Sequence, residues 1–183
     1  FYRCFKQAGL RVFDVEELST HGGSLRVFGC HQNDSRVTTE SVNSMLSEEV
    51  SRGLQSLTTY KNVQARADKV KDDLLSFLIE QKRVGKKVAA YGAAAKGNTL
   101  LNYAGMKPDL LPFVCDAAPA KQGKYMPGSH IPILPPSALT ESAPDYVLIL
   151  PWNIAAEVKQ QNVALAAQGI QFVTAVPKLV VFN

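Results

Sequence analysis

The sequence predicts an α/β fold in which a parallel sheet is flanked by helices and preceded by a helical lead-in, a helix and a β-hairpin. Three observations predict this order. From residue 86 onward, short continuous apolar runs alternate with stretches of helical period, which is typical of parallel strands buried on both faces. Residues 33–85 contain a polar linker and two helical stretches, and the first 32 residues contain one helical stretch and two strand-like runs.

The first eight residues predict a helix that ends at Gly9, and its apolar face consists of Phe1, Cys4, Phe5 and Ala8. Two strands are expected next, Leu10–Glu16 with alternating polar and apolar residues, and Ser24–Cys30. A helix followed by two strands is typical of the end of an α/β unit whose sheet lies upstream. Since the sequence also starts without an initiator Met, we expect a piece of a longer protein.

The hexapeptide HGGSLR, from His21 to Arg26, separates these two strands. One interpretation is a glycine bulge at the entrance of the second strand, with His21 on the surface. In the other, the backbone approaches a ligand closely and His21 or Ser24 contributes a polar contact. The spacing favours the first interpretation.

Residues 33–85 are expected to form a linker and a helical lead-in. Gln32–Arg36 is polar and rich in turn formers. A first helix is expected near Val42–Val50, with candidate N-caps at Thr38, Thr39 and Ser41. A second, longer amphipathic helix is expected to begin near Thr58 and to end at Gly85.

The remainder predicts the parallel sheet. Its expected strands are Val88–Tyr91, Leu111–Asp116, Tyr146–Leu150 and Phe172–Val176, with Lys178–Phe182 as a closing edge strand. Helices are expected after Lys96 and over Ile154–Gln168. Because ligands of such sheets bind beyond the carboxyl ends of the strands, three segments are candidates for a site: Gly92–Asn98, the loop after Asp116, and Pro151–Asn153.

The run KVAAYGAAAKGNTLLNY, residues 87–103, predicts a strand, a tight turn and the start of a helix. Glycines at such a turn, followed by unpaired N–H groups at a helix N-terminus, favour a phosphate or another anion, and Lys96 adds a positive charge. The spacing matches neither the dinucleotide GxGxxG pattern nor a P-loop. Two interpretations therefore stay open, a ligand-binding turn or a plain βα connection that needs small residues for packing.

The loop DAAPAKQGKYMPGSHIPI, from Asp116 to Ile133, is longer than an ordinary βα connection, and loops of this length are more often functional than idle. Lys121 and Lys124 suit phosphate, Gln122 suits a polar base edge, and Tyr125 suits stacking. The alternative is a surface loop stiffened by its prolines, with solvated lysines.

Two further side chains have open interpretations. His130 is either part of the ligand site or a residue that hydrogen-bonds its own loop together. Trp152, between Pro151 and Asn153, is either a packing residue or one wall of the site.

Composition limits the partners of this 183-residue chain. The net charge of +4 is spread along the sequence, so nucleic-acid binding is not expected, whereas an anionic small molecule would suit a mildly cationic surface. The three cysteines are far apart and odd in number, which indicates a reducing compartment, and no cluster has the spacing of a metal site. Without a membrane-spanning run or a signal peptide, a soluble cytoplasmic protein is expected.

Three motifs taken together resemble the S-adenosylmethionine-dependent sugar C-methyltransferases: HGGSLR at His21, YGAAAKGNTLLNY at Tyr91 and DAAPAKQGKYMPGSHIPI at Asp116. The resemblance covers essentially the whole chain in order. Enzymes of that family methylate C3 of nucleotide-linked 4-keto-6-deoxysugars. In them a zinc-binding region precedes a methyltransferase domain, and a Rossmann-like C-terminal domain helps to hold the sugar nucleotide.

The resemblance implies a division of the chain. Residues 1–32 would be the tail of the methyltransferase domain, residues 33–85 the linker and helical lead-in, and residues 86–183 the Rossmann-like domain. The zinc cysteines, the S-adenosylmethionine loop and the catalytic cluster would lie upstream of Phe1, so neither cofactor is expected to bind this fragment, which alone would be inactive. Ala118 departs from the family pattern, in which a polar residue precedes the proline.

The resemblance also implies roles for residues. In the complete enzyme, a base would remove a proton from C3 to give an enolate that accepts the methyl group, and no residue here is assigned as that base. Only His21 and Ser24 would approach the reacting sugar. The residues expected to bind the sugar nucleotide are Gly92, Ala93, Lys96, Gly97, Asn98, Asp116, Lys121, Gln122, Gly123, Lys124, His130 and Trp152.

A competing hypothesis is a stand-alone Rossmann-like module that binds NAD or coenzyme A, or a regulatory interaction domain. Asp116 follows the second strand at roughly the distance from the glycine turn where a ribose-binding acid is expected. The turn itself argues against this hypothesis, because Lys96 occupies a place that a dinucleotide would crowd.

Overall fold

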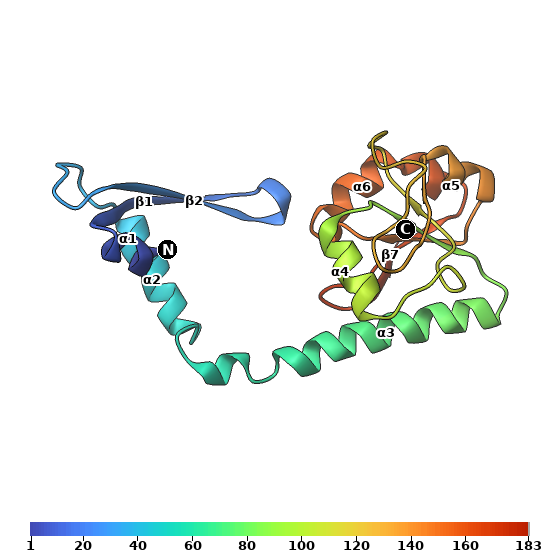
Figure 1. Cartoon of the computed structure of the whole chain (residues 1–183), viewed down its shortest axis with the longest axis horizontal. Helices are drawn as coiled ribbons and strands as arrows, with labels where there is room; N and C mark the ends of the chain where they lie inside the picture. Colours follow the sequence, from blue (N-terminus) through green and yellow to red (C-terminus); the bar gives the residue numbers. More distant parts are fainter. Residues whose placement is uncertain (183) are drawn as a thin grey trace. The chain divides into compact units, whose positions relative to one another are not determined.

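A computed structural model describes residues 1–182 of the chain (Figure 1). The chain forms two compact units, one from Phe1 to Val63 and the other from Gln64 onward. Each unit contains its own β-sheet.

The first unit is an antiparallel hairpin with two helices against its first strand; the first helix and the hairpin were expected, whereas the packing of the second helix on the hairpin was not. β1 (Leu10–Leu18) pairs with β2 (Ser24–His31), and the short helix η1 (Thr20–Gly22) lies in the turn between them. Two helices contact β1: α1 (Tyr2–Gln7) and α2 (Glu40–Ser51). A further short helix, η2 (Leu57–Tyr60), ends the unit.

Asp14 fastens α2 to β1. Its carboxylate accepts hydrogen bonds from the hydroxyls of Thr39 at 2.7 Å and Ser41 at 2.8 Å, and these bonds lower the pKa of Asp14 below its ordinary value. Thr39 is the N-cap residue of α2, yet its side chain accepts no hydrogen bond from the helix. The expected capping residues therefore connect the helix to the strand instead of capping its N–H groups.

The second unit is built on a six-stranded sheet with the order β5-β4-β3-β6-β7-β8. All neighbouring strands are parallel except β7 and β8, which are antiparallel. β3, the first strand of this sheet along the chain, lies inside it with β4 on one side and β6 on the other. This Rossmann-like order confirms the predicted α/β fold. The strands are β3 (Val88–Tyr91), β4 (Val114–Cys115), β5 (Ile133–Leu134), β6 (Tyr146–Ile149), β7 (Gln171–Thr174) and β8 (Val180–Phe182).

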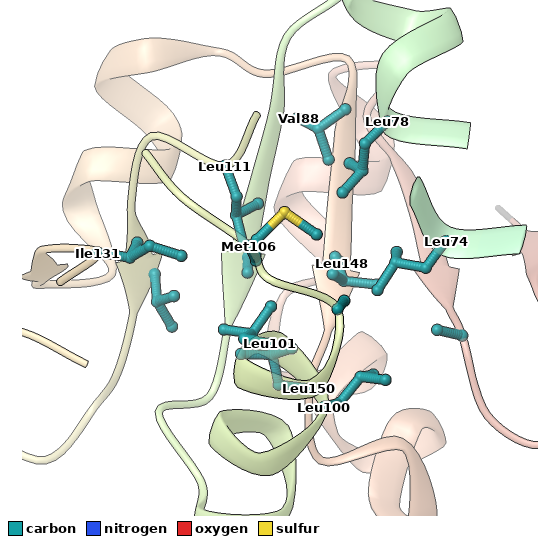
Figure 2. Close-up of a cluster of buried hydrophobic side chains, with 14 of the residues drawn as sticks. Leu74, Leu78, Val88, Leu100, Leu101, Met106, Leu111, Ile131, Leu148 and Leu150 are labelled. Atoms are coloured by element: carbon teal, nitrogen blue, oxygen red, sulfur yellow. The ribbon is translucent and has the colours of Figure 1, made fainter. Parts of the chain in front are cut away.

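Helices cover both faces of this sheet. α3 (Val63–Arg83) and α4 (Ala95–Tyr103) pack on one face, where Leu74 and Leu78 of α3 share a buried cluster with Val88 and Leu148 of the strands (Figure 2). The other face is covered by α5 (Ser137–Ser142), α6 (Ala155–Gln161) and α7 (Val163–Ala167). Because both faces of the sheet are covered, the central strand β3 is apolar and buried at every position.

The structure corrects three expected elements and adds two that were not expected. β4 is shorter than Leu111–Asp116, because the N–H of Leu111 turns back to the carbonyl of Lys107 and Pro112 has no N–H for a strand ladder. The expected helix over Ile154–Gln168 consists of η3 (Trp152–Ile154), α6 and α7, with a break at Asn162. The long helix begins at Val63 and not near Thr58, and β5 and α5 were not expected at all.

Candidate functional site

Three loops leave the sheet next to one another at the carboxyl ends of neighbouring strands. β3 is followed by Gly92–Ala94, β4 by residues 116–122, and β6 by Pro151–Asn153. β4 and β6 both pair with β3, so the three loops start side by side. In a sheet of this order, the connections diverge on either side of β3, and this is where ligands of such folds bind.

The carboxylate of Asp116 fastens the second loop to the first. Its Oδ2 accepts hydrogen bonds from the N–H of Ala93 at 2.7 Å and the ammonium of Lys121 at 3.0 Å, and its Oδ1 accepts one from the N–H of Ala118 at 2.8 Å. Lys121 donates a second hydrogen bond, to the carbonyl of Ala93 at 3.0 Å. We call Ala93, Asp116, Ala118 and Lys121 the Asp116 clasp.

The carboxyl group of Asp116 is ionised at neutral pH. Burial raises the pKa of Asp116, but the hydrogen bonds from Ala118, Lys121 and Ala93 lower it by more, so the pKa lies below its ordinary value. The ion pair with Lys121 is therefore a charge-assisted contact at neutral pH. The Lys121 side chain stays 44% exposed, and an ammonium has three N–H donors, so one donor remains for a ligand.

Gln122 closes the second loop from within, because its side-chain amide donates to the carbonyl of Asp116 at 2.9 Å. The side chain predicted to read a base edge thus has a structural partner. It lies directly beside the clasp and is half-buried.

The two glycines of the turn are explained by close packing. Gly92 has a φ of +90°, and a Cβ there would lie 2.5 Å from Cδ of Pro151. A Cβ at Gly97 would lie 2.6 Å from Cβ of Leu150. Both positions therefore need glycine for packing. The missing side chains let the start of α4 lie close to the residues that follow β6.

The N-terminus of α4 lies at the same edge of the sheet. Its N-cap residue is Ala94, which has no capping side chain, and the N–H groups of the first turn have no acceptor within the helix itself. The ammonium of Lys96 donates to Oδ1 of Asn153 at 2.5 Å and lies 5.6 Å from the ring centre of Trp152. Lys96 thus joins the start of α4 to the third loop and carries an exposed positive charge at the carboxyl ends of the strands.

Other predicted residues lie elsewhere. Oδ1 of Asn98 is buried and has no partner among the described residues, so this side chain is turned into the protein. Gly123 and Lys124 run antiparallel to the segment around Ile133, through backbone hydrogen bonds of 2.9 and 2.8 Å. Lys124 and Tyr125 are exposed.

The turn that contains His130 lies against the opposite end of α4 from Lys96. Asn102 donates to the carbonyl of Pro127 at 2.9 Å, and Lys107 donates to that of Gly128 at 3.1 Å. His130 is exposed, with a φ of +58°. The structure therefore does not bring His130 together with the clasp.

His21 and Ser24 belong to the first unit. His21 is exposed in the hairpin turn with a φ of +56°, and the hydroxyl of Ser24 donates to the carbonyl of Thr20 at 3.0 Å. The turn continues through Gly22 and Gly23, which also have positive φ values, as a glycine-rich connection between strands requires.

Sequence reasoning placed Asn153 in a candidate segment but did not predict its hydrogen bond with Lys96, and it missed the N–H of Ala118 as a donor to Asp116. Asn153 has a weak sequence signal, because it follows the end of a buried strand. The Ala118 contact uses only the backbone, so the identity of its side chain carries no signal.

Other chemistries have little support in the described structure. Residues 1–182 contain no group of three or more His, Cys, Asp or Glu side chains that could hold a metal ion. Burial raises the pKa of Cys115 to about 12, so this thiol is not a nucleophile at neutral pH. Within the same residues, no helix combines the length and the apolar character needed to cross a membrane.

Comparison with known proteins gives two matches. Residues 19–177 match the family described as the C-methyltransferase C-terminal domain. The chain is also 35% identical over 174 residues to the C-methyltransferase NovU of Streptomyces niveus. This match covers 95% of the chain but only 41% of the relative, so the chain spans about two fifths of the length of the curated relative it matches.

Proposed function

Because this chain belongs to the family of C-methyltransferase C-terminal domains, we propose that it is the part of a C-methyltransferase that binds a nucleotide-linked sugar. The proposed substrate of the complete enzyme is a nucleotide-linked 4-keto-deoxysugar, which receives a methyl group on carbon. The Asp116 clasp is the observation that carries this proposal, because it joins two loops at the edge where ligands of such sheets bind.

The donors at this edge suit a diphosphate. Lys96 and Lys121 supply two ammonium groups, and α4 supplies uncapped N–H groups at the positive end of its helix dipole. Charge-assisted hydrogen bonds of this kind are roughly twice as strong as neutral ones. We propose that the pyrophosphate of the sugar nucleotide binds between the N-terminus of α4 and Lys121, with Trp152 beside it.

The methyl donor is proposed to bind outside this chain. S-adenosylmethionine supplies the methyl group when bound, and its ribose needs a free acceptor such as an acid at the end of the second strand. Asp116 stands at that place, but its carboxylate already accepts three hydrogen bonds from within the protein, so these residues do not fit the cofactor. Zinc is likewise proposed to bind outside this chain.

His21 and Ser24 keep their predicted place near the reacting sugar as part of this proposal. The alternative function, a stand-alone module for NAD or coenzyme A or for regulation, is weakened by the same occupied carboxylate. A cytoplasmic location remains a prediction from the cysteine content.

Calorimetric titration of the chain with dTDP, NAD and coenzyme A tests the proposal. We expect dTDP to bind and the other two ligands to bind more weakly or not at all. Binding of NAD or coenzyme A without binding of dTDP would support the alternative and defeat the sugar-nucleotide proposal. The control variant Lys87→Met changes an exposed lysine at the amino end of β3, far from the carboxyl ends where the site lies. This variant should bind dTDP like the wild type.

A further inference from the structure

The position of Asp116 in the sheet matters for ligand choice. Asp116 directly follows β4, which pairs with the first strand of the sheet, β3. In dinucleotide-binding folds with this strand order, an acidic residue at this place accepts hydrogen bonds from the ribose hydroxyls. A carboxylate that is free and faces the ligand is required for that role.

Asp116 does not meet this requirement. Its Oδ2 accepts two hydrogen bonds and its Oδ1 accepts one, and the whole residue is only 8% exposed. A carboxylate offers about four acceptor positions, so about one remains, whereas a ribose diol uses two. Two of the three donors are backbone N–H groups, and Lys121 is the only side chain among them.

We infer that Lys121 determines the ligand specificity of this edge, by occupying the carboxylate that a dinucleotide would need and by turning its remaining N–H toward a phosphate. The inference rests on the proposed function and adds the class of ligand: a nucleoside diphosphate ester in which the diphosphate, and not a ribose diol, is the anchored group. Lys121 is a half-exposed side chain at the rim of the clasp, so it reaches both Asp116 and the solvent side of the loop.

The charges at this edge agree with such a ligand. Lys121 and Asp116 neutralise each other, so the positive charge that remains comes from Lys96 and from the N-terminus of α4. A diphosphate brings its negative charge to that point. A free Asp116 carboxylate would repel it.

Two variants of Lys121 test the inference by calorimetry with dTDP and NAD. Lys121→Met removes the ammonium and frees one acceptor of Asp116, so the binding of dTDP should weaken by about tenfold or more, the effect of losing one charge-assisted contact. NAD also carries a diphosphate, so loss of the ammonium weakens both ligands; the preference for dTDP over NAD should still fall by about tenfold, because only NAD has a ribose diol that the freed carboxylate can bind. Lys121→Arg keeps the charge and the donors and should retain the wild-type preference.

The outcomes separate this inference from the proposed function. If wild-type chain binds no dTDP, the proposed function fails and the inference fails with it. If wild-type chain prefers dTDP and Lys121→Met shows the same preference, only the inference is overturned. Thermal melting followed by circular dichroism checks that the variants are folded, and Lys121→Gln, measured in parallel, serves if Lys121→Met is unfolded.

Discussion

Replacing Asp116 by alanine is expected to destabilise the second unit by about 2–4 kcal/mol. The substitution removes the acceptor of the Ala93 and Ala118 N–H groups, both of which belong to partly buried residues. A donor left without a partner costs about 1–3 kcal/mol when it is buried, and partial burial places these two in the lower half of that range. The ammonium of Lys121 adds little, because its 44% exposed side chain can turn to water.

Urea unfolding followed by tryptophan fluorescence measures this effect. The chain has one tryptophan, Trp152, and it lies in the second unit, so the signal reports on that unit. Asp109→Ala is the matched control. Asp109 pairs with Lys82 at 3.5 Å with both side chains more than half exposed, and such a pair contributes about 0–1 kcal/mol.

The pH dependence has a definite sign. Because the folded-state pKa of Asp116 is lowered, its contribution to stability is fully present above the pKa of the unfolded chain, about 3.9, and is lost as the pH falls through the folded value. The difference between wild type and Asp116→Ala should therefore be constant between about pH 5 and 7 and shrink below about pH 4. A difference under about 0.5 kcal/mol at pH 7, or one that grows in acid, would refute the role of the clasp.

Three further predictions concern a lysine, a glycine and the cysteines. Lys96→Ala should weaken dTDP binding by about tenfold without changing the melting temperature, and unchanged affinity in calorimetry would remove Lys96 from the site. Gly97→Ala should cost about 1–3 kcal/mol in urea unfolding, because its Cβ would lie 2.6 Å from Cβ of Leu150, and a cost near zero would show that the helix shifts freely. A thiol reagent should modify the exposed Cys4 rapidly and the buried Cys115 only on unfolding, as mass spectrometry of the labelled peptides would show, whereas equal rates would contradict the burial of Cys115.

Much of the second unit could be predicted from the sequence, because its central strands, such as β3 and β6, are buried on both faces. Val88–Tyr91 was predicted with its observed bounds, and the edge strand at the C-terminus was expected within two residues of its start. Val88–Tyr91 is apolar and buried at every position, follows two lysines and is followed by a glycine, so its pattern is strong. β5 could not be predicted, because its two residues become a strand only by pairing with β4.

For the candidate site, the sequence indicated the loops but not their contacts. Lys96, Asp116 and Lys121 were expected to contact a ligand directly, and the structure gives each of them a partner inside the protein. His130 was expected in the same site because it belongs to the same loop, yet its turn is held by the far end of α4. A loop of this length can fold back, and sequence distance does not say which of its side chains return to the strand end.

The sequence by itself determined the alternation of strands and helices and the polar loops at the carboxyl ends of the strands. The reason is that the local spacing of apolar residues indicates which segments are buried. Only the tertiary structure decided what the polar residues do. Hydrogen bonds join groups that are far apart in the chain, such as the N–H of Ala93 and the carboxylate of Asp116, and their geometry follows from the packing of the sheet. That packing lets Asp116 hold two loops together through its hydrogen bonds, and it places the ammonium groups of Lys96 and Lys121 at the site.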